Sequence, residues 1–361
     1  MELIIKNIRL LVLFLCLPLV AQENISGTEV IIHTINNDAD INLSNRYGEI
    51  QIQNWKKDSI KVVISYSYTA DKKDRVNRIK SGISFEKVIT NSYAQINTIF
   101  GKTNNNFSNE NFSLHRSIEN SDVSIRYKVY IPEGVTLSVQ NKFGDIYFGD
   151  IKGDVEVRLS HGNLRGNKIT GRLNATVKYG QINLNSLNYA VIELNHSNNG
   201  NIQYAKKLIL NSSFSKLSIS KVDFLKLRSK KDKVFIQEVN TLNGSSSMSK
   251  IHIAQLNKNI NLTSNLFGHT DIDLVKSGFE GINIKSSNNK INIIFDSSCS
   301  FNTDITLKNA ELIHSNSYKN LTTVLTGKKT KNITGIVGQN NKTNSSVNIT
   351  IESSTLTLNN L

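Results

Sequence analysis

The sequence predicts an all-β protein, a parallel β-solenoid with coils of about 18 residues. Three observations predict this fold. Gly144, Gly162 and Gly180 recur at an interval of 18 residues, and a fixed repeat of this length is typical of stacked structural repeats. Apolar and polar residues alternate between these glycines, which is the period of a β-strand. Polar or glycine-bearing turns such as GDIKGD and SHGN separate the alternating segments.

Apolar residues repeat in step with the glycines. Two sets share their positions within the repeat: Ile146, Leu164, Ile182, and Ile151, Ile169, Leu187. Strands of a stacked coil pair with the strands one coil away at about 4.8 Å. We therefore expect each set to form a continuous internal column. We also expect glycine at each corner to supply the positive φ that a sharp turn requires.

The repeat extends in both directions, with a less regular sequence and spacing. An earlier copy, YGEIQIQNW, begins at Tyr47. Later copies begin at successive anchors spaced 15 to 21 residues apart: Gly200, Ser215, Asp232, Ser249, Gly268 and Asn289. Insertions at the turns explain the drift, because the strands keep their alternation.

The segment between the first copy and the main array has a different pattern. Residues 59–70 read as a strand, and residues 71–82 as a short helix with Asp71 as N-cap and Gly82 as stop. ISFEKVI and SYAQINTIF read as a hairpin, residues 101–122 as a mobile Asn/Ser-rich segment, and the strand after it ends at Pro132. We expect this β-rich segment, with its one helix, to cover the first apolar cross-section, because open sheet edges invite aggregation.

The first residues predict export to the periplasm or the cell surface. Lys6 and Arg9 precede an apolar run, Leu10 to Ala21, that has signal-peptide length and is too short to span a bilayer. No later segment is apolar enough to cross a membrane. The expected organisation is thus a signal peptide (1–21), a first coil with its cap (22–133) and solenoid repeats (134–361).

The cysteine content and the net charge limit the kinds of site and partner that the sequence predicts. After signal removal Cys299 is the remaining cysteine, so no intramolecular disulfide can form, and a buried small residue is favoured over a nucleophile. The net charge of +14 indicates either an anionic partner or a bias toward Lys, Asn and Ile. The lysines are scattered and nucleic-acid motifs are missing, so the bias is favoured and a nucleic-acid partner is not expected.

Three features carry a resemblance to a known family. They are YGEIQIQNW, the segment YKVYIPEGVTLSVQNKFGDIYF from Tyr127, and the turns of the FGDI and YGQI kind. Together they resemble an exported bacterial β-solenoid family of unknown function, related to candidate adhesin-head domains. The resemblance covers almost all of the chain after residue 21. It implies the solenoid fold and a binding role, and it brings no catalytic residues.

Catalytic, metal and cofactor sites are not predicted. Asp145, Asp150 and Asp154 share one repeat, but the column below Asp145 continues as Asn163 and Gln181, so no acidic cluster builds up. The histidines lack metal-ligand spacing, and phosphate-loop, dinucleotide and G-x-S-x-G motifs are missing. We therefore expect a protein that is not an enzyme.

Two sets of residues are candidates for binding. Phe143, His161 and Tyr179 form a column that is either an exposed ladder for sugar rings or a corner stack that caps the core, and the core stack is favoured. The second set gathers at one turn: Arg228, Lys230, Lys231 and Lys233. It is either a ridge for acidic polysaccharide or lipid phosphate or, as favoured, a solvated turn.

The function that follows is a non-enzymatic, adhesin-like or scaffold protein at the bacterial cell envelope. Its expected partners are envelope glycans or proteins. Two alternatives remain open: a solenoid carbohydrate-active enzyme, and a binder of anionic polysaccharide or lipid through the basic corner.

Overall fold

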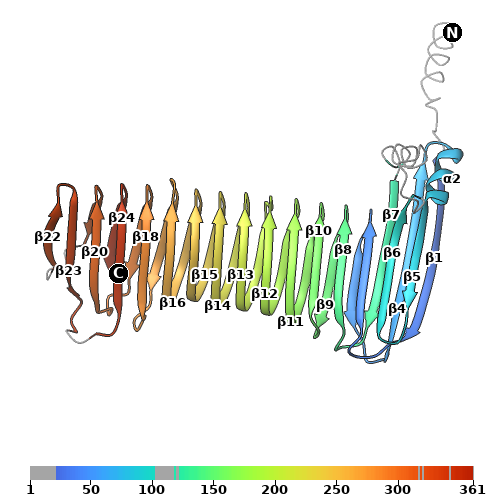
Figure 1. Cartoon of the computed structure of the whole chain (residues 1–361), viewed down its shortest axis with the longest axis horizontal. Coiled ribbons are helices and arrows are strands. Elements are labelled where there is room, and N and C mark those ends of the chain that lie inside the picture. Colours follow the sequence, from blue (N-terminus) through green and yellow to red (C-terminus); the bar gives the residue numbers. More distant parts are fainter. Residues whose placement is uncertain are drawn as a thin grey trace, which may run out of the picture.

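The computed structural model describes residues 22–101, 118, 122–315, 318, 321–340 and 343–360. The expected signal peptide and most of the Asn/Ser-rich segment lie outside the described residues. The described chain is all-β apart from helix α2 (Lys73–Gly82) and residue 118, and its strands follow one another along one axis (Figure 1).

Parallel pairing builds two ladders from the repeats. Six long strands cross the second ladder and then the first: β11 (Leu164–Lys178), β12 (Ile182–Asn195), β13 (Gly200–Ser213), β14 (Lys216–Lys230), β15 (Lys233–Ser247) and β16 (Lys250–Asn265). The first ladder also contains β2 (Asp40–Arg46), β8 (Thr136–Lys142), β10 (Val155–Ser160), β18 (Gly281–Ser287) and β24 (Ser346–Glu352). The second also contains β3 (Ile50–Asn54), β9 (Ile146–Ile151), β17 (His269–Val275), β19 (Lys290–Phe295) and β25 (Thr355–Asn360).

The register confirms the predicted apolar columns. Ile169 pairs with Ile151 on one side and with Leu187 on the other, and its side chain is buried. Each strand thus lies beside the equivalent strand of the next repeat, so a row, meaning one repeat, stacks on the row before it. This all-β, mostly parallel arrangement is consistent with a solenoid.

The corners correct the expected role of glycine. The residue before each glycine takes the positive φ, as at Phe143 (59°), His161 (56°) and Tyr179 (56°). Glycine is needed instead because the rows approach closely: a Cβ on Gly162 would lie 2.1 Å from the carbonyl oxygen of Gly144. No side chain fits in that space.

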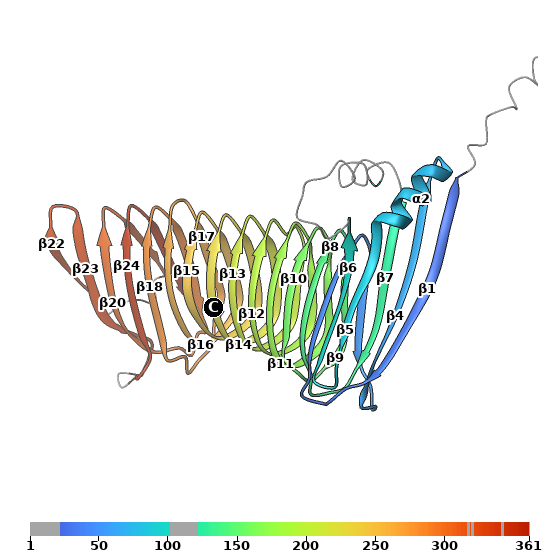
Figure 2. The same ribbon diagram turned by 45° about the vertical axis from the view of Figure 1, so that its right-hand side comes forward.

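The N-terminal segment continues both ladders past the first row. β6 (Tyr93–Phe100) pairs with β2 and is followed by antiparallel β5 (Ile83–Ile89). β7 (Asp122–Ile131) pairs with β3 and is followed by antiparallel β4 (Ser59–Ala70) and β1 (Glu23–Thr34). These strands therefore lie beside the first row on both ladders, and α2 lies at one end of them (Figure 2).

The helix begins differently from the prediction. Lys72 occupies the N-cap position and makes no capping hydrogen bond with its side chain. Asp71 lies one residue earlier, and its carboxylate accepts a hydrogen bond from the Arg75 guanidinium at 2.7 Å. Burial of Val76 and Ile79 stabilises the helix, because tertiary packing of an apolar face contributes more than its cap.

The C-terminal end departs from a purely sequential array. β24 pairs in parallel with both β18 and β20 (Phe301–Lys308), so the last row lies between two rows that precede it in sequence (Figure 1). β21 (Glu311–His314) pairs with β25, while β22 (Leu321–Gly327) and β23 (Thr330–Val337) form an antiparallel hairpin beside β20. The expected parallel array through residue 361 is corrected at this end.

The core is an apolar interior shared by the two ladders, rich in Ile, Leu and Val. Cys299 is buried in it, as predicted. Burial raises the pKa of its thiol to about 11, so the nucleophilic thiolate is scarce at neutral pH. Among the described residues no helix has the length and apolarity needed to cross a membrane.

Candidate binding site

Six rings stack along one corner of the molecule, which we call the aromatic pile. Its members occupy left-handed positions, with φ from 53° to 63°, at six successive corners: Tyr47, Phe143, His161, Tyr179, His196 and Phe214. Neighbouring ring centroids are 5.0 to 5.4 Å apart and the planes differ by 7° to 25°. Each stacked pair contributes about 0.5–1.5 kcal/mol, comparable with the cost of about 1–2 kcal/mol for a left-handed residue.

The pile lies outside the core. Phe143 is 38% exposed, Tyr179 55% and Phe214 46%, so the favoured expectation that these residues cap the core is corrected. The physical reason is the positive φ, since each side chain leaves the corner in the direction of solvent rather than of the two ladders.

Sugar stacking on the pile is limited by the rings themselves. Each inner ring has a neighbour on both faces. At one end the ring of Phe100 meets Tyr47 edge-on, with centroids 5.5 Å apart. The Arg46 guanidinium lies beside the pile, 4.7 Å from the centroid of Tyr47 and 5.5 Å from that of Phe143. At the other end the Lys231 ammonium lies 4.8 Å from the centroid of Phe214. A sugar that packs on an aromatic face would meet ring edges here.

The four predicted cations do not form one ridge. Lys231 covers Phe214 at the corner. Arg228 and Lys230 lie together on the first ladder, at the margin of a shallow hollow of about 520 Å³. Lys233 begins β15 on the second ladder. The corner thus separates Arg228 and Lys230 from Lys233.

A different cationic feature runs across the rows, and we call it the basic column. Five side chains occupy the same register position in five successive strands of the second ladder: Lys216, Lys233, Lys250, His269 and Lys290. The four lysines are exposed. Within the described ranges no acidic group lies within salt-bridge distance of them, whereas the Nε2 atom of His269 lies 2.9 Å from Oδ1 of Asp271.

The sequence contained a signal for this column that reading along each row misses. Its residues are the second letters of the aligned row anchors SK, DK, SK, GH and NK. Crowding within one row indicates Arg228–Lys233 instead. Equivalent positions in successive rows indicate the column, because a stacked repeat places equivalent residues side by side.

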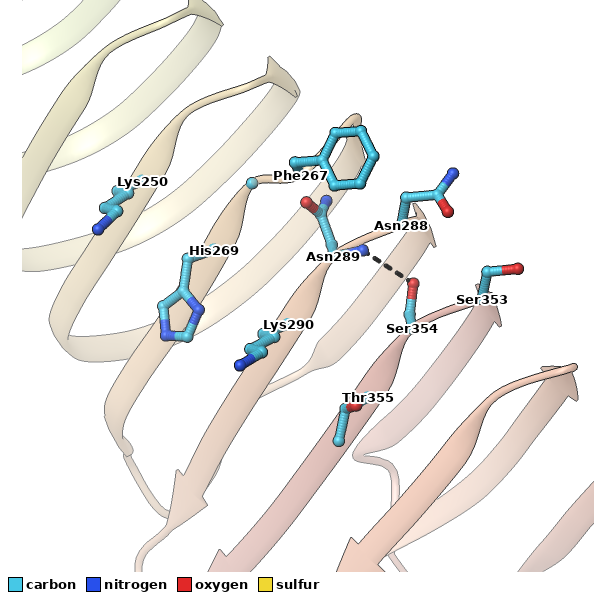
Figure 3. A pocket seen from close by; sticks show the side chains of 10 residues that line it. Lys250, Phe267, His269, Asn288, Asn289, Lys290, Ser353, Ser354 and Thr355 are labelled. Carbon is cyan, nitrogen blue, oxygen red and sulfur yellow. Dashed lines mark hydrogen bonds between the residues drawn. The ribbon is translucent and has the colours of Figure 1, made fainter.

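Two hollows follow the basic column. One, of about 400 Å³, is lined by Lys216, Lys233 and Lys250 together with Phe235. The other, of about 510 Å³, is lined by Lys250, His269 and Lys290 together with Phe267 (Figure 3). Lys250 and His269 border both, so the hollows adjoin along the column.

A buried corner supports the first two members of the column. Asp232 is 3% exposed. Its carboxylate accepts hydrogen bonds from the Ser212 hydroxyl at 2.5 Å, the Ser229 hydroxyl at 2.7 Å and the Ser215 backbone N–H at 2.8 Å. A fully satisfied buried carboxylate fixes local geometry, so Lys216 and Lys233 start from a well-defined backbone.

The carboxylates considered as catalytic candidates join neighbouring rows. Asp145 accepts a hydrogen bond from the Asn163 backbone N–H at 2.8 Å, and Asp154 accepts one from the Arg172 backbone N–H at 2.8 Å. Asp150 accepts one from the Asn167 side chain at 2.6 Å. These contacts are structural.

Two histidine–aspartate pairs lie at the basic column, one formed by its member His269 and one beside it. His252 Nε2 is 2.6 Å from Asp273 Oδ2, and His269 pairs with Asp271 as described above. Across the part of the chain that the structure describes, no three His, Cys, Asp or Glu residues are grouped so that they could hold a metal ion.

Known proteins offer few matches to this chain. No protein-family model and no curated protein match it. Solved structures with some likeness include a candidate cell adhesion protein from Clostridium sporogenes, with 9% identity, a TM-score of 0.19, and coverage of 94% of this chain and 100% of the other. A candidate adhesin from Parabacteroides merdae has 10% identity, a TM-score of 0.33, and coverage of 92% and 95%.

A third structure is a candidate lipid-binding protein from Parabacteroides distasonis, with 11% identity, a TM-score of 0.27, and coverage of 92% and 96%. At these scores the likeness carries no argument about the fold or function of this chain.

Proposed function

We propose that the chain is a β-solenoid exported to the bacterial cell envelope, where it binds or scaffolds envelope glycans or proteins without catalysing a reaction. The observation that carries this proposal is the repetition of exposed side chains in register across successive rows, as in the basic column. A surface that presents the same group many times binds repetitive partners with added avidity, even where each contact is weak.

The predicted signal peptide supports the proposed location. An exported protein meets glycans and surface proteins rather than cytoplasmic metabolites. The periplasm and the outer surface both fit this proposal.

A carbohydrate-active enzyme is the second candidate. The pairs His252–Asp273 and His269–Asp271 favour it, because they lie beside the 400 Å³ hollow and a histidine beside a carboxylate can transfer protons. Glycoside hydrolysis, however, ordinarily requires two carboxyl groups on opposite sides of the bond that breaks. The non-enzymatic role is therefore the primary proposal.

The experiment that separates these candidates uses residues 22–361 on an array of bacterial envelope glycans and on fixed bacterial cells. Saturable binding with no release of reducing ends is the expected result. Release of reducing ends from a bound glycan would favour the enzyme. A protein that binds neither glycans, cells nor envelope proteins would refute the adhesin-like role.

A further inference from the structure

We propose that the basic column binds a linear acidic polysaccharide that lies along the two adjoining hollows. This inference rests on the proposed function, because it names the class of envelope ligand. It shares Lys233 with the predicted basic corner and differs in its other residues and in its direction, since the ligand runs across the rows rather than around one turn. The column is Lys216, Lys233, Lys250, His269 and Lys290.

The charge arrangement favours an anionic occupant. Like charges on neighbouring strands repel one another, and like charges directly opposite on paired strands are destabilising. The column places Lys216, Lys233 and Lys250 in this relation without a salt-bridge partner among the described residues. An anion that bridges neighbouring lysines would relieve that repulsion.

The width of the column favours a linear polymer over a membrane surface. Phe235, His252 and Asp271 occupy the next outward positions on the same strands, and Asp273 lies one position further along. A flat anionic bilayer resting on this ladder would also approach the carboxylates of Asp271 and Asp273. A single polymer chain can contact the cations and leave these acids in water.

The surroundings also favour a sugar polymer over a single-stranded nucleic acid. Proteins that hold single strands stack successive bases on aromatic faces. Beside the column, Phe267 is 85% exposed and Phe235 contacts the His252 ring edge-on, while each inner ring of the aromatic pile has a neighbour on both faces. The hollow beside Phe267 is also lined by the accessible polar residues Asn288, Ser353 and Thr355 (Figure 3), and such groups hydrogen-bond hydroxyls.

The spacing suits a repeating charge. Five positions in neighbouring strands span about 19 Å, since each step is about 4.8 Å. A polymer with a carboxylate on each sugar would meet several cations at once, so individually weak contacts add together.

The test is titration of the whole exported chain, residues 22–361, with polygalacturonate at several salt concentrations. The column variant carries Lys216→Gln, Lys233→Gln and Lys250→Gln. The control variant removes the same charge from exposed sites near α2: Lys72→Gln, Lys73→Gln and Lys80→Gln. Binding by the column variant should be at least tenfold weaker, as expected for three surface ion contacts of about 0.5 kcal/mol or more each, and binding by the control should change less than twofold.

Folding and salt provide further readouts. The exposed lysines contribute no stabilising contact, so the Tm of the column variant should equal or exceed that of the parent chain. Affinity of the parent chain should fall steeply with salt, because exposed charges are screened. Equal loss of binding in both variants, salt-independent binding, or no binding of polygalacturonate by the parent chain would overturn the proposal.

Other ligands separate this inference from the proposed function. Binding of neutral dextran but not polygalacturonate would overturn the basic column as the site and leave the adhesin-like role standing. Binding of phosphatidylglycerol vesicles or of single-stranded DNA in place of polygalacturonate, lost in the column variant, would overturn the choice of a polysaccharide.

Discussion

The substitution Gly162→Ala tests how closely the rows approach at the corner. A Cβ at this position would lie 2.1 Å from the carbonyl oxygen of Gly144, and contacts shorter than 3.0 Å do not occur for real Cβ atoms. The obstacle is backbone rather than a flexible side chain, so the two corners must separate by about 0.9 Å.

The magnitude follows from what that separation breaks. Two hydrogen bonds join these corners, from the Phe143 N–H to the Ser160 carbonyl at 3.0 Å and from the Ile146 N–H to the Asn163 carbonyl at 2.9 Å. Each contributes about 1 kcal/mol net, and the stacked ring pair at the same corner contributes about 1 kcal/mol. We expect Gly162→Ala to lower the free energy of unfolding of these rows by about 3 kcal/mol.

Gly149→Ala is the matched control. Its Cβ would approach the Cβ of Gln53 at 3.3 Å, which is tight but not prohibitive. Alanine would also stabilise the fold by about 0.4–1 kcal/mol, because it lowers the conformational entropy of the unfolded chain. Hydrogen exchange of residues 136–195 measures the local stability of both variants, and thermal unfolding gives their Tm. Equal protection and equal Tm in Gly162→Ala and Gly149→Ala would refute the close-approach argument.

Three further predictions concern the core, the C-terminal row and one ion pair. Ile169→Asp should unfold its rows locally, because it buries an unpaired charge, whereas Lys168→Asp should not; an unchanged Tm in Ile169→Asp would count against the column. Removal of residues 341–361 should abolish hydrogen-exchange protection of β18 to β21 while β8 to β16 stay protected, and loss along the whole chain would contradict the row-by-row account. A hydrogen bond from Lys221 lowers the pKa of Glu238. The pair therefore stabilises the fold at pH values above the ordinary pKa of glutamate. Glu238→Gln should cost about 0.5 kcal/mol at neutral pH, and in thermal unfolding the difference from the parent should vanish as the pH falls through the lowered pKa; a constant difference would exclude the pair as its cause.

The repeat could be predicted because stacked rows need residues of similar size and polarity at equivalent positions. Ile151, Ile169 and Leu187 must all fit the same buried slot, so the sequence repeats them and the columns become visible. The first copy at Tyr47 could also be placed, since its pattern matches a row even though a long insertion follows it. The strand Ile50–Asn54 indeed pairs with β9.

The position of the last row could not be predicted. β24 alternates like any other strand, and nothing local distinguishes a strand that ends the stack from one that enters between β18 and β20. The position depends on which edges the neighbouring strands leave open, since β23 pairs with one edge of β20 and β24 with the other, and this is a property of the whole C-terminal end.

The candidate binding residues were predicted in part. Phe143, His161 and Tyr179 do lie together, but the positive φ that turns them outward belongs to the corner rather than to the glycine that follows, since His196 and Phe214 take it before Ser197 and Ser215. That conformation is a property of the three-dimensional corner. Similarly, the importance of Lys233 lies in its neighbours on adjacent rows rather than in the lysines beside it in sequence.

The stacking of rows is the claim on which the columns, the pile and the proposed ligand all depend, and distances between spin labels measure it directly. One outward column of the second ladder runs through Arg165, Ser218, His252 and Asn292. With Cys299 replaced by Ser, labels at Arg165 and each of the other three lie three, five and seven rows apart. At about 4.8 Å a row, the backbone separations should be about 14, 24 and 34 Å. A linear increase supports the stack, and distances that level off or fall with row number would contradict it.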